Sequence, residues 1–297
     1  MRFAVLIALL KSLRPAQWTK NGLLFVGFIF SIQQGHTIKE LLTVIAAFAV
    51  FCGVSGAIYL VNDIADREQD RLHPRKSKRP IAAGELSVPA AIVAAVVLMA
   101  AGIWCAFALN TPFGILTLAY IILTLSYSAC LKHYVIVDVL ALTGGFVIRA
   151  VAGAKVIMVP ISSWLLLCAT LLALFLGLAK RRGELMSLEE GGANHRKTLG
   201  EYTAPMLDQM ISVTASTTLM AYCLYTFSAV SRVTGKPNPA MMITIPFVVY
   251  GLFRYLLLIH TSNAGASPEA VLIKDKPMLI NLLLYVAAAV AGLLIRP

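Results

Sequence analysis

Charged side chains are scarce in this chain: they are 13% of its residues, whereas a soluble domain carries about 25%. Hydrophobic residues make up 59% of the sequence, and its mean hydropathy is +0.82. One soluble core could not hide so many apolar side chains, since soluble domains are only about 45–50% apolar. The composition therefore excludes an ordinary soluble domain and predicts that lipid surrounds much of the chain.

The sequence also lacks the spacings that mark zinc sites, disulfide frameworks and nucleotide-binding loops. Its five cysteines lie in apolar stretches, where they are typical of small buried hydrophobic positions, at Cys52, Cys105, Cys130, Cys168 and Cys223. The apolar run within Met1–Leu10 is too short to span a bilayer, which needs about 20 residues, and no small-residue cleavage site follows it. Residues 1–15 are therefore predicted to form an interfacial helix.

Apolar stretches of roughly membrane length recur along the rest of the sequence. Nine spans are predicted, at residues 21–34 (short), 41–61, 88–108, 112–129, 135–153, 161–179, 209–230, 240–259 and 277–295. The only break between the third and fourth spans is Asn110-Thr111-Pro112, which predicts a tight turn. The predicted fold is all-α: a polytopic membrane protein with about nine transmembrane helices, in one domain covering residues 1–297.

Basic residues are unevenly divided between the two predicted faces. One face carries Arg2, Lys11, Arg14, Lys20, Arg67, Arg71, Arg75, Lys76, Lys78, Arg79, Lys132, Lys180, Arg181, Arg182, Arg196, Lys197, Lys274 and Lys276. The other carries Lys39, Arg232, Lys236 and Arg296. The positive-inside rule makes the richer face cytoplasmic. It predicts a cell-membrane protein with a cytoplasmic N-terminus and cytoplasmic loops at 62–87, 130–134, 180–208 and 260–276.

The strongest chemical signal is the stretch Asn62-Asp63-Ile64-Ala65-Asp66-Arg67-Glu68-Gln69-Asp70, just after the second span. If the helix continues, residues 62, 66 and 70 share one face, with residue 63 adjacent. Carboxylates that converge in this way repel one another unless a cation lies between them, and Mg²⁺ prefers such oxygen ligands. The stretch predicts a magnesium site, with a solvated acidic turn as the alternative.

A basic run, His73-Pro74-Arg75-Lys76-Ser77-Lys78-Arg79-Pro80, follows the acids and leads to Gly84. Metal-binding acids followed by Lys and Arg are suited to a diphosphate, because the metal and the cations share its oxygens. By itself the basic run is also typical of a positive-inside anchor or a contact with anionic lipid. Next to the acids it favours a diphosphate site.

NDxxDxxxD followed by KxxRPxAxG resembles the first aspartate-rich motif of the UbiA-type intramembrane prenyltransferase superfamily. The resemblance implies a UbiA-like helical bundle with a cavity on the cytoplasmic side, where Mg²⁺ binds a diphosphate substrate. Members of the superfamily typically carry a second aspartate-rich motif after the sixth span. Here that place reads Lys180-Arg181-Arg182-Gly183-Glu184, which is basic and poorly suited to a second magnesium ion.

That basic segment resembles a narrower branch, the decaprenyl-phosphate phosphoribosyltransferases. Three further segments carry the resemblance: residues 14–21 (RPAQWTKN), 196–203 (RKTLGEYT) and 268–275 (PEAVLIKD). The branch implies transfer of phosphoribose from 5-phosphoribosyl 1-diphosphate to a polyprenyl phosphate, which supplies pentose donors for cell-wall polymers such as arabinogalactan. No nucleic-acid partner is predicted, and the sequence leaves a homo-oligomer and the length of the polyprenyl tail open.

The resemblance assigns roles residue by residue. Asn62, Asp63, Asp66 and Asp70 are expected to hold Mg²⁺ and the donor diphosphate, with Lys76 and Arg79 on its oxygens. Lys180 and Arg181 are expected to hold the acceptor phosphate or the donor 5-phosphate, and Glu184 to orient Arg181 or contact ribose. Tyr127 and Lys132 bind phosphate in one interpretation; in the other they are an interfacial tyrosine and an anchor lysine. Lys20 has the same two interpretations. The catalytic set is Asp63, Asp66, Asp70 and Lys132.

A few residues outside the motifs also lie at apparent membrane depth or in close helix contacts. Arg149 and Arg254 are functional hypotheses because charges within spans are rare, although Arg149 could snorkel to the interface. Asp138 either orients Lys132 or is a helix N-terminal charge. Gly144, Gly145 and Gly153 predict close packing of the fifth span.

Two competing functions remain at this point. The first is transfer of a prenyl group from its diphosphate to an aromatic or other acceptor, which the basic 180–184 segment argues against. The second is a polyprenyl-lipid transporter, which would place its polar groups at mid-membrane rather than at one face.

Overall fold

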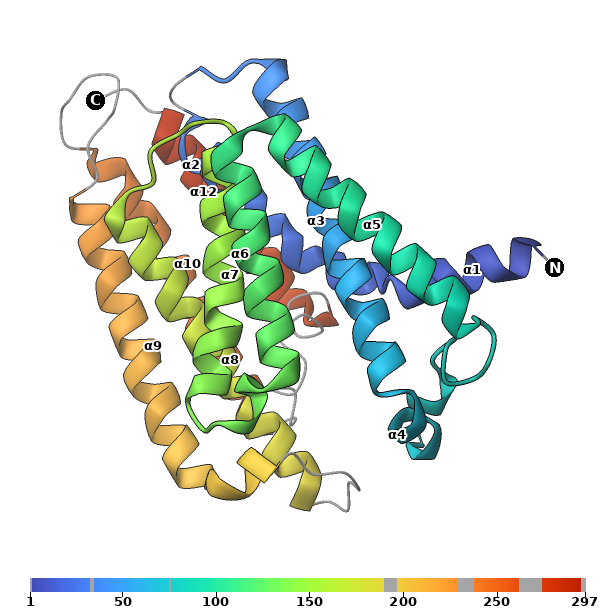
Figure 1. Ribbon diagram of the computed structural model, residues 1–297. Coiled ribbons are helices and arrows are strands. Elements are labelled where there is room, and N and C mark those ends of the chain that lie inside the picture. The colour runs from blue at the N-terminus through green and yellow to red at the C-terminus, as the bar shows by residue number, and fades with distance from the viewer. Residues whose placement is uncertain are drawn as a thin grey trace.

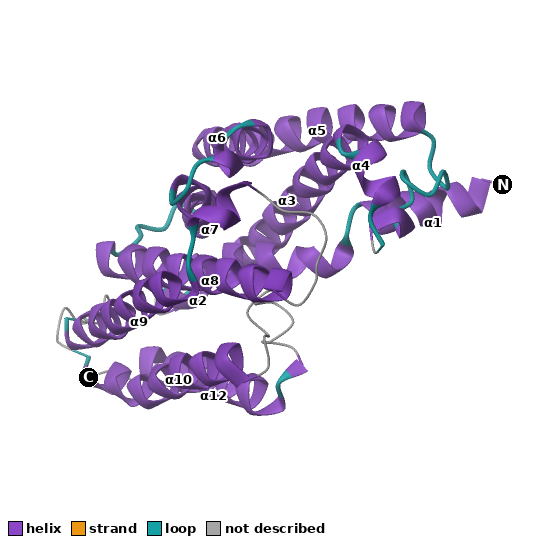
Figure 2. Ribbon diagram, turned by 90° about the horizontal axis from the view of Figure 1, so that it is seen from below, coloured by secondary structure: helices purple, strands orange, loops and turns teal. Residues whose placement is uncertain are grey.

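The computed structural model describes residues 2–32, 35–74, 76–189, 197–228, 238–261 and 274–294. Within these ranges every regular element is a helix, and none is a strand (Figure 2). Arg75, Arg196 and residues 268–273, which belong to the motifs noted above, lie outside the described residues.

Eight described helices are long and apolar enough to cross a membrane. They are α3 (Ile38–Ala65), α5 (Val88–Leu109), α6 (Thr111–Ala129), α7 (Val137–Val156), α8 (Ser163–Glu189), α9 (Ala204–Phe227), α10 (Ile245–Thr261) with the preceding 3-10 turn η6 (Pro239–Thr244), and α12 (Lys276–Leu294). The predicted all-α membrane fold is therefore confirmed. The turn between α5 and α6 is also where it was expected, and the Asn110 side chain caps α6 by accepting a hydrogen bond from the Phe113 N–H at 2.8 Å.

The chain reverses direction at each connection, so the connections fall at two ends of the bundle (Figure 1). One end, lower in Figure 1, carries α4 (Arg67–Leu72), η3 (Lys76–Lys78), η4 (Leu131–His133) and η5 (Lys197–Glu201). Seen from that end, α5 and α6 lie along one side, α10 and α12 along the other, and α3, α7 and α8 between them (Figure 2). The described parts of the 62–80 and 180–184 motifs thus belong to one end of the molecule.

The first predicted span has a different form. Residues 21–34 were expected to be one short helix, but η1 (Pro15–Leu24) is a 3-10 helix and the α-helix that follows it, α2 (Phe25–Phe30), is short. The preceding helix, α1 (Arg2–Ser12), agrees with the predicted N-terminal helix. Between α1 and η1, Arg14 has a left-handed backbone (φ 52°, ψ 65°), and Pro15 then begins the 3-10 segment.

Both η1 and α2 lie in close contact with α7. A Cβ atom added to Gly153 would lie 1.9 Å from the Leu24 carbonyl oxygen, and one added to Gly27 would lie 2.6 Å from the Ala154 Cα atom. Both helices therefore approach each other backbone to backbone, which only glycine permits. The predicted role of Gly153 in close packing is borne out.

A buried polar cluster lies next to this contact. Arg149 of α7 donates to the Asn21 Oδ1 atom at 2.9 Å, to the Gly145 carbonyl at 3.0 Å and to the Tyr120 hydroxyl at 2.7 Å. The Asn21 amide in turn lies 3.3 Å from the Ser55 hydroxyl of α3. Arg149 is 6% exposed, so its buried side chain links η1, α6 and α7 and does not extend to the membrane interface.

Replacement of Gly153 by Ala is expected to separate η1 from α7 and to lower the free energy of unfolding by about 1–3 kcal/mol or more, the usual cost of overpacking. Gly22→Ala is the matched control, because no atom lies within 4 Å of the added Cβ. Thermal unfolding of the detergent-solubilised protein measures both. Equal melting temperatures for the two variants would contradict the contact.

Candidate active site

The acidic motif lies where α3 gives way to α4. The α-helix ends at Ala65 and a new one begins at Arg67, so the helix is not continuous as assumed from sequence. The hydrogen bonds nevertheless keep the helical register: the Asp66 N–H donates to the Asn62 carbonyl at 2.9 Å, and the Asp70 N–H donates to the Asp66 carbonyl at 2.8 Å. Asp63 and Asp70 are the two buried members of the motif, each 2% exposed.

A single guanidinium joins these two buried carboxylates. The Arg79 Nη1 atom lies 3.1 Å from the Asp63 Oδ1 atom and 2.5 Å from the Asp70 Oδ2 atom. The Lys76 Nζ atom is 3.9 Å from the Asp70 Oδ1 atom. The predicted acids and the predicted diphosphate-binding cations are therefore brought together, and the acids converge on one point. We call Asp63, Asp70, Lys76 and Arg79, with Arg14, the aspartate cluster.

Arg14 belongs to the aspartate cluster although the sequence analysis, which counted it on the cytoplasmic face and in the 14–21 segment, gave it no role at the site. Its Nη2 atom lies 2.5 Å from the Asp63 Oδ1 atom, and its guanidinium carbon is 4.8 Å from the centre of the Tyr59 ring. Arg14 precedes η1, whereas Asp63 ends α3. No spacing in the sequence signals a contact between residues so far apart in the chain.

A second cluster lies at the same end, between α6, α7 and α8. Arg181 is fully buried, and its guanidinium donates to Asp138 (2.5 Å), to the Tyr127 hydroxyl (3.0 Å) and to Glu184. Lys180 Nζ lies 4.0 Å from the other Glu184 oxygen. We call these residues the Arg181 cluster. It assembles four predicted site residues and adds Asp138, which pairs with Arg181.

Tyr202, which follows η5, is also part of the Arg181 cluster, through a hydrogen bond to Asp138. Its hydroxyl donates to the Asp138 Oδ1 atom at 3.1 Å and accepts a hydrogen bond from the Ile136 N–H at 2.7 Å. Burial raises the pKa of Tyr202 to about 12. The hydroxyl therefore keeps its proton throughout the physiological range and remains a donor to Asp138. This tyrosine lies in the 196–203 motif, but its partner could not be read from the sequence.

Helix α8 positions the basic residues of the Arg181 cluster. The helix continues past the predicted end of the span at residue 179 as far as Glu189, so Lys180, Arg181 and Glu184 are helical rather than part of a loop. One helical turn separates Arg181 from Glu184, which is the spacing at which opposite charges meet on a helix. The next residue, Arg182, turns to the other side, where it pairs with Asp208 of α9 and donates to the Ile259 carbonyl at 2.9 Å.

The remaining predicted residues lie on three segments of the chain, η4, η1 and the end of α3. Lys132 is in η4, the turn between α6 and α7, and is partly buried. Lys20 is partly buried in η1, next to the buried Asn21. Asn62 and Asp66 are partly buried at the end of α3. All of them belong to the end of the bundle or to the segment that carries Arg14.

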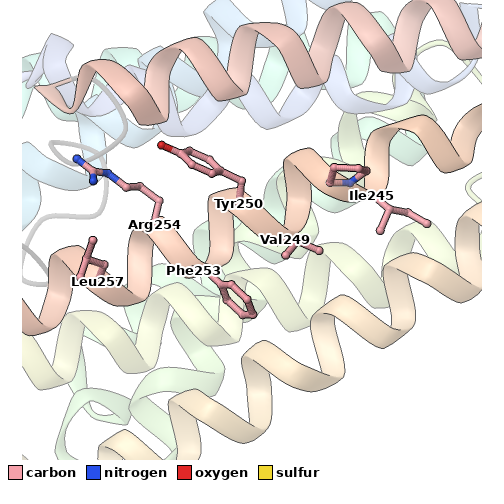
Figure 3. Close-up of a pocket in the computed structure, with 7 residues that line it drawn as sticks. Ile245, Val249, Tyr250, Phe253, Arg254 and Leu257 are labelled. Carbon is pink, nitrogen blue, oxygen red and sulfur yellow. The ribbon is translucent and has the colours of Figure 1, made fainter.

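A groove of about 550 Å³ lies elsewhere, on the outer face of α10. Its lining is apolar apart from Tyr250 and Arg254, which point to the same side of the helix (Figure 3). Arg254 binds Asp275 with two nitrogens, at 3.2 and 2.8 Å, and this hydrogen bonding holds the pKa of Asp275 below its usual value. Arg254, which was a functional hypothesis from the sequence, thus links α10 to the start of α12, and the groove contains no residue of the aspartate or Arg181 clusters.

The aspartate cluster suits one kind of metal. Among the described residues, no three His, Cys, Asp or Glu side chains are grouped to enclose an ion. Two buried carboxylates instead converge on one nitrogen. Mg²⁺ commonly binds through one or two carboxylates while phosphate oxygens and water complete its shell, so an acid pair of this kind fits Mg²⁺ with a phosphate substrate better than a protein-only metal cage.

Comparison with known proteins agrees with the fold and the motifs. The family model described as "UbiA prenyltransferase family" matches residues 22–293. A decaprenyl-phosphate phosphoribosyltransferase of Corynebacterium glutamicum is 34% identical over 97% of this chain and 87% of its own length. The enzyme of the same name from Mycolicibacterium smegmatis is 33% identical, over 96% and 92% of the two chains.

The solved structure of a UbiA homolog from Archaeoglobus fulgidus, bound to GPP and Mg²⁺, has the same fold. Its TM-score is 0.72, and the match covers 97% of this chain and 100% of the other at 18% identity. At this identity the likeness concerns the fold alone.

Replacement of Asp138 by Asn is expected to destabilise the protein by about 3–5 kcal/mol, because Arg181 would remain buried with half of its counter-charge removed. Glu68→Gln serves as the comparison, because the Glu68 side chain is 74% exposed in its pair with Arg71, and such pairs contribute about 0–1 kcal/mol. Unfolding in detergent measures both losses. A stability loss for Asp138→Asn no larger than that of the comparison would show that the Arg181 cluster does not hold α7 and α8 together.

Proposed function

The chain belongs to the UbiA prenyltransferase family, and from this membership we propose that it transfers 5-phosphoribose from 5-phosphoribosyl 1-diphosphate to a polyprenyl phosphate, with release of diphosphate. Its apolar helices make it a multi-pass membrane protein. The phosphoribosyltransferases of C. glutamicum and M. smegmatis match over nearly its whole length, which supports this reaction and a decaprenyl-type acceptor. The whole chain is proposed to be one catalytic domain.

One observation favours this reaction over prenyl transfer: the two acids of the Arg181 cluster, Asp138 and Glu184, both form ion pairs with Arg181. A second magnesium-diphosphate clamp would need those carboxylates free for metal, but the Arg181 side chain is held between them at 1% exposure, whereas Arg14 and Arg79 of the aspartate cluster are 29% and 26% exposed. With them neutralised, and with Lys180 beside them, the cluster suits a phosphate monoester that carries no metal. Prenyl transfer to an aromatic acceptor remains the alternative, since the family as a whole supports it.

Magnesium is proposed to bind at the aspartate cluster, with Asp63 and Asp70 as buried ligands and Asn62 and Asp66 completing the set. The Mg²⁺ in the A. fulgidus homolog supports the use of a divalent metal. When bound, the ion would neutralise the departing diphosphate. Lys76 and Arg79 supply further fixed positive charge to the same oxygens, and such preorganised charge is the largest contribution to many enzymatic rates.

Two anions must meet in this reaction, and the basic residues are proposed to bring them together. Lys180, with Tyr127 and Lys132, holds the acceptor phosphate or the donor 5-phosphate; Lys20 approaches from η1. Glu184 and Asp138 fix the buried Arg181 guanidinium, and Lys180 beside it is the more exposed of the two cations. Positioning of this kind converts a meeting of two reactants into a nearly unimolecular step.

The proposed phosphoribosyl transfer needs little general acid or base catalysis. A phosphate monoester has a second pKa of about 6, so the acceptor is already largely ionised at neutral pH. One of its oxygens forms a bond to the anomeric carbon while the bond from that carbon to the diphosphate oxygen breaks. The electron pair leaves with the diphosphate. The positive-inside distribution of basic residues places this site at the cytoplasmic face of the cell membrane.

Membranes that contain the protein are expected to convert labelled 5-phosphoribosyl 1-diphosphate and a polyprenyl phosphate into a lipid-extractable ribose phosphate. The conversion is expected to stop when a chelator removes magnesium and to return when magnesium is added. Partition of the label between butanol and water measures the product. If the label stays in water while a prenyl diphosphate and an aromatic acid react, the prenyltransferase alternative is correct.

Asp63→Asn and Asp66→Asn are each expected to lower the turnover by about 10²-fold or more, as is usual when a group that stabilises developing charge is removed. Glu68→Gln is the matched control within the same motif, since Glu68 is exposed and pairs with Arg67 and Arg71 at the surface. Size-exclusion profiles check that each variant is folded. Full turnover in folded Asp63→Asn would refute the metal assignment.

A further inference from the structure

Two arginines hold the carboxylate that the proposed function gives to magnesium. The Asp63 Oδ1 atom accepts from Arg14 at 2.5 Å and from Arg79 at 3.1 Å. The same Arg79 nitrogen lies 2.5 Å from Asp70. A magnesium ion binds carboxylate oxygens at about 2.0–2.1 Å, so it cannot share the point between the two aspartates with a guanidinium nitrogen.

We propose that Arg14 and Arg79 are exchangeable counter-ions, which release the aspartates to magnesium and take up oxygens of the donor diphosphate instead. The inference rests on the metal site of the proposed function and adds Arg14 to the residues that bind the donor. The exchange conserves hydrogen bonds: each guanidinium gives up a carboxylate oxygen and gains a phosphate oxygen, to which arginine binds at least as well.

The charges of the aspartate cluster favour this exchange. Asp63 and Asp70 are almost completely buried, and Arg14, Arg79 and Lys76 neutralise them. Magnesium alone would bring two more positive charges into a cluster that is already neutralised. Diphosphate alone would meet two buried carboxylates. Bound together, the two ligands satisfy all of these groups, so each is expected to increase the affinity of the other.

The backbone of Arg14 is a second, independent observation. Its φ of 52° and ψ of 65° are the left-handed conformation, which glycine adopts with far less strain than arginine. A strained residue persists when its surroundings hold it, and such residues gather at ligand sites. Here the side chain rests on the Tyr59 ring and on Asp63, with 29% of its surface exposed. The guanidinium can therefore leave Asp63 without leaving the site.

Equilibrium dialysis of the purified full-length protein tests the exchange with two probes, Mn²⁺ and labelled inorganic pyrophosphate. In the wild type, saturating Mn²⁺ is expected to tighten pyrophosphate binding by roughly 5–150-fold, the usual range of coupling between two sites. In Arg14→Gln, Mn²⁺ alone is expected to bind about tenfold more tightly because a competitor is gone. Pyrophosphate with Mn²⁺ is expected to bind about tenfold more weakly because a ligand is lost.

Three further variants exclude simpler explanations. Arg14→Gly relieves the left-handed backbone while removing the side chain, so it is expected to be more stable than Arg14→Gln and to shift both affinities as Arg14→Gln does. Arg14→Lys keeps the charge and is expected to retain part of the coupling. Arg71→Gln removes an exposed arginine nearby, paired with Glu68, and is expected to change neither affinity.

Opposite changes in the two affinities are the signature of exchange. If Arg14 only anchors η1 to α3, the Gln and Gly variants bind both probes more weakly or leave both unchanged, and the proposal is wrong. The probes contain neither ribose nor a prenyl group. A failure of phosphoribosyl transfer in the labelled-donor assay is therefore distinguishable from a failure of the exchange.

Discussion

Pairing between buried carboxylates and guanidinium groups organises the functional end of this protein. At the aspartate cluster, Arg79 joins Asp63 to Asp70; at the Arg181 cluster, one arginine joins Asp138 to Glu184. A buried charge is costly unless it is paired and hydrogen-bonded, so neither side of these pairs can be buried alone. Each acid is buried together with its base, so one cluster holds the end of α3 against Arg14 and Arg79, and the other holds the start of α7 against α8.

The 3-10 helix η1 connects the aspartate cluster to the packed interior of the helix bundle. Glycines at its crossing with α7 let the two backbones touch, and the same segment directly follows Arg14 and contains Lys20. The packing inside the bundle thus decides where a cation at its end can reach, which links a steric feature of the core to the chemistry of the site.

Much of this could be predicted from the sequence because it is local. Runs of apolar residues predicted eight helices within a few residues, and the spacing of Asp63, Asp70 and Arg79 predicted that acids and bases would meet. Contacts between distant segments gave no such signal. The approach of Arg14 to Asp63, and of Asp138 to Arg181, depends on how helices pack rather than on periodicity. The 3-10 form of η1, which packs closely against α7, likewise gave no signal in the local hydropathy.

Arg149 has a consequence for how the protein is made. An arginine at the centre of a lone helix raises the free energy of membrane insertion by about 2.5–3.5 kcal/mol. Its hydrogen-bond partners come from Asn21, synthesised long before it, and from Tyr120 of the preceding helix. Insertion of α7 is therefore easiest when the earlier segments are still beside the translocon to receive the guanidinium. The hydrogen bonds of Arg149 therefore favour assembly in the order of synthesis, in which α7 packs against segments that have already been made.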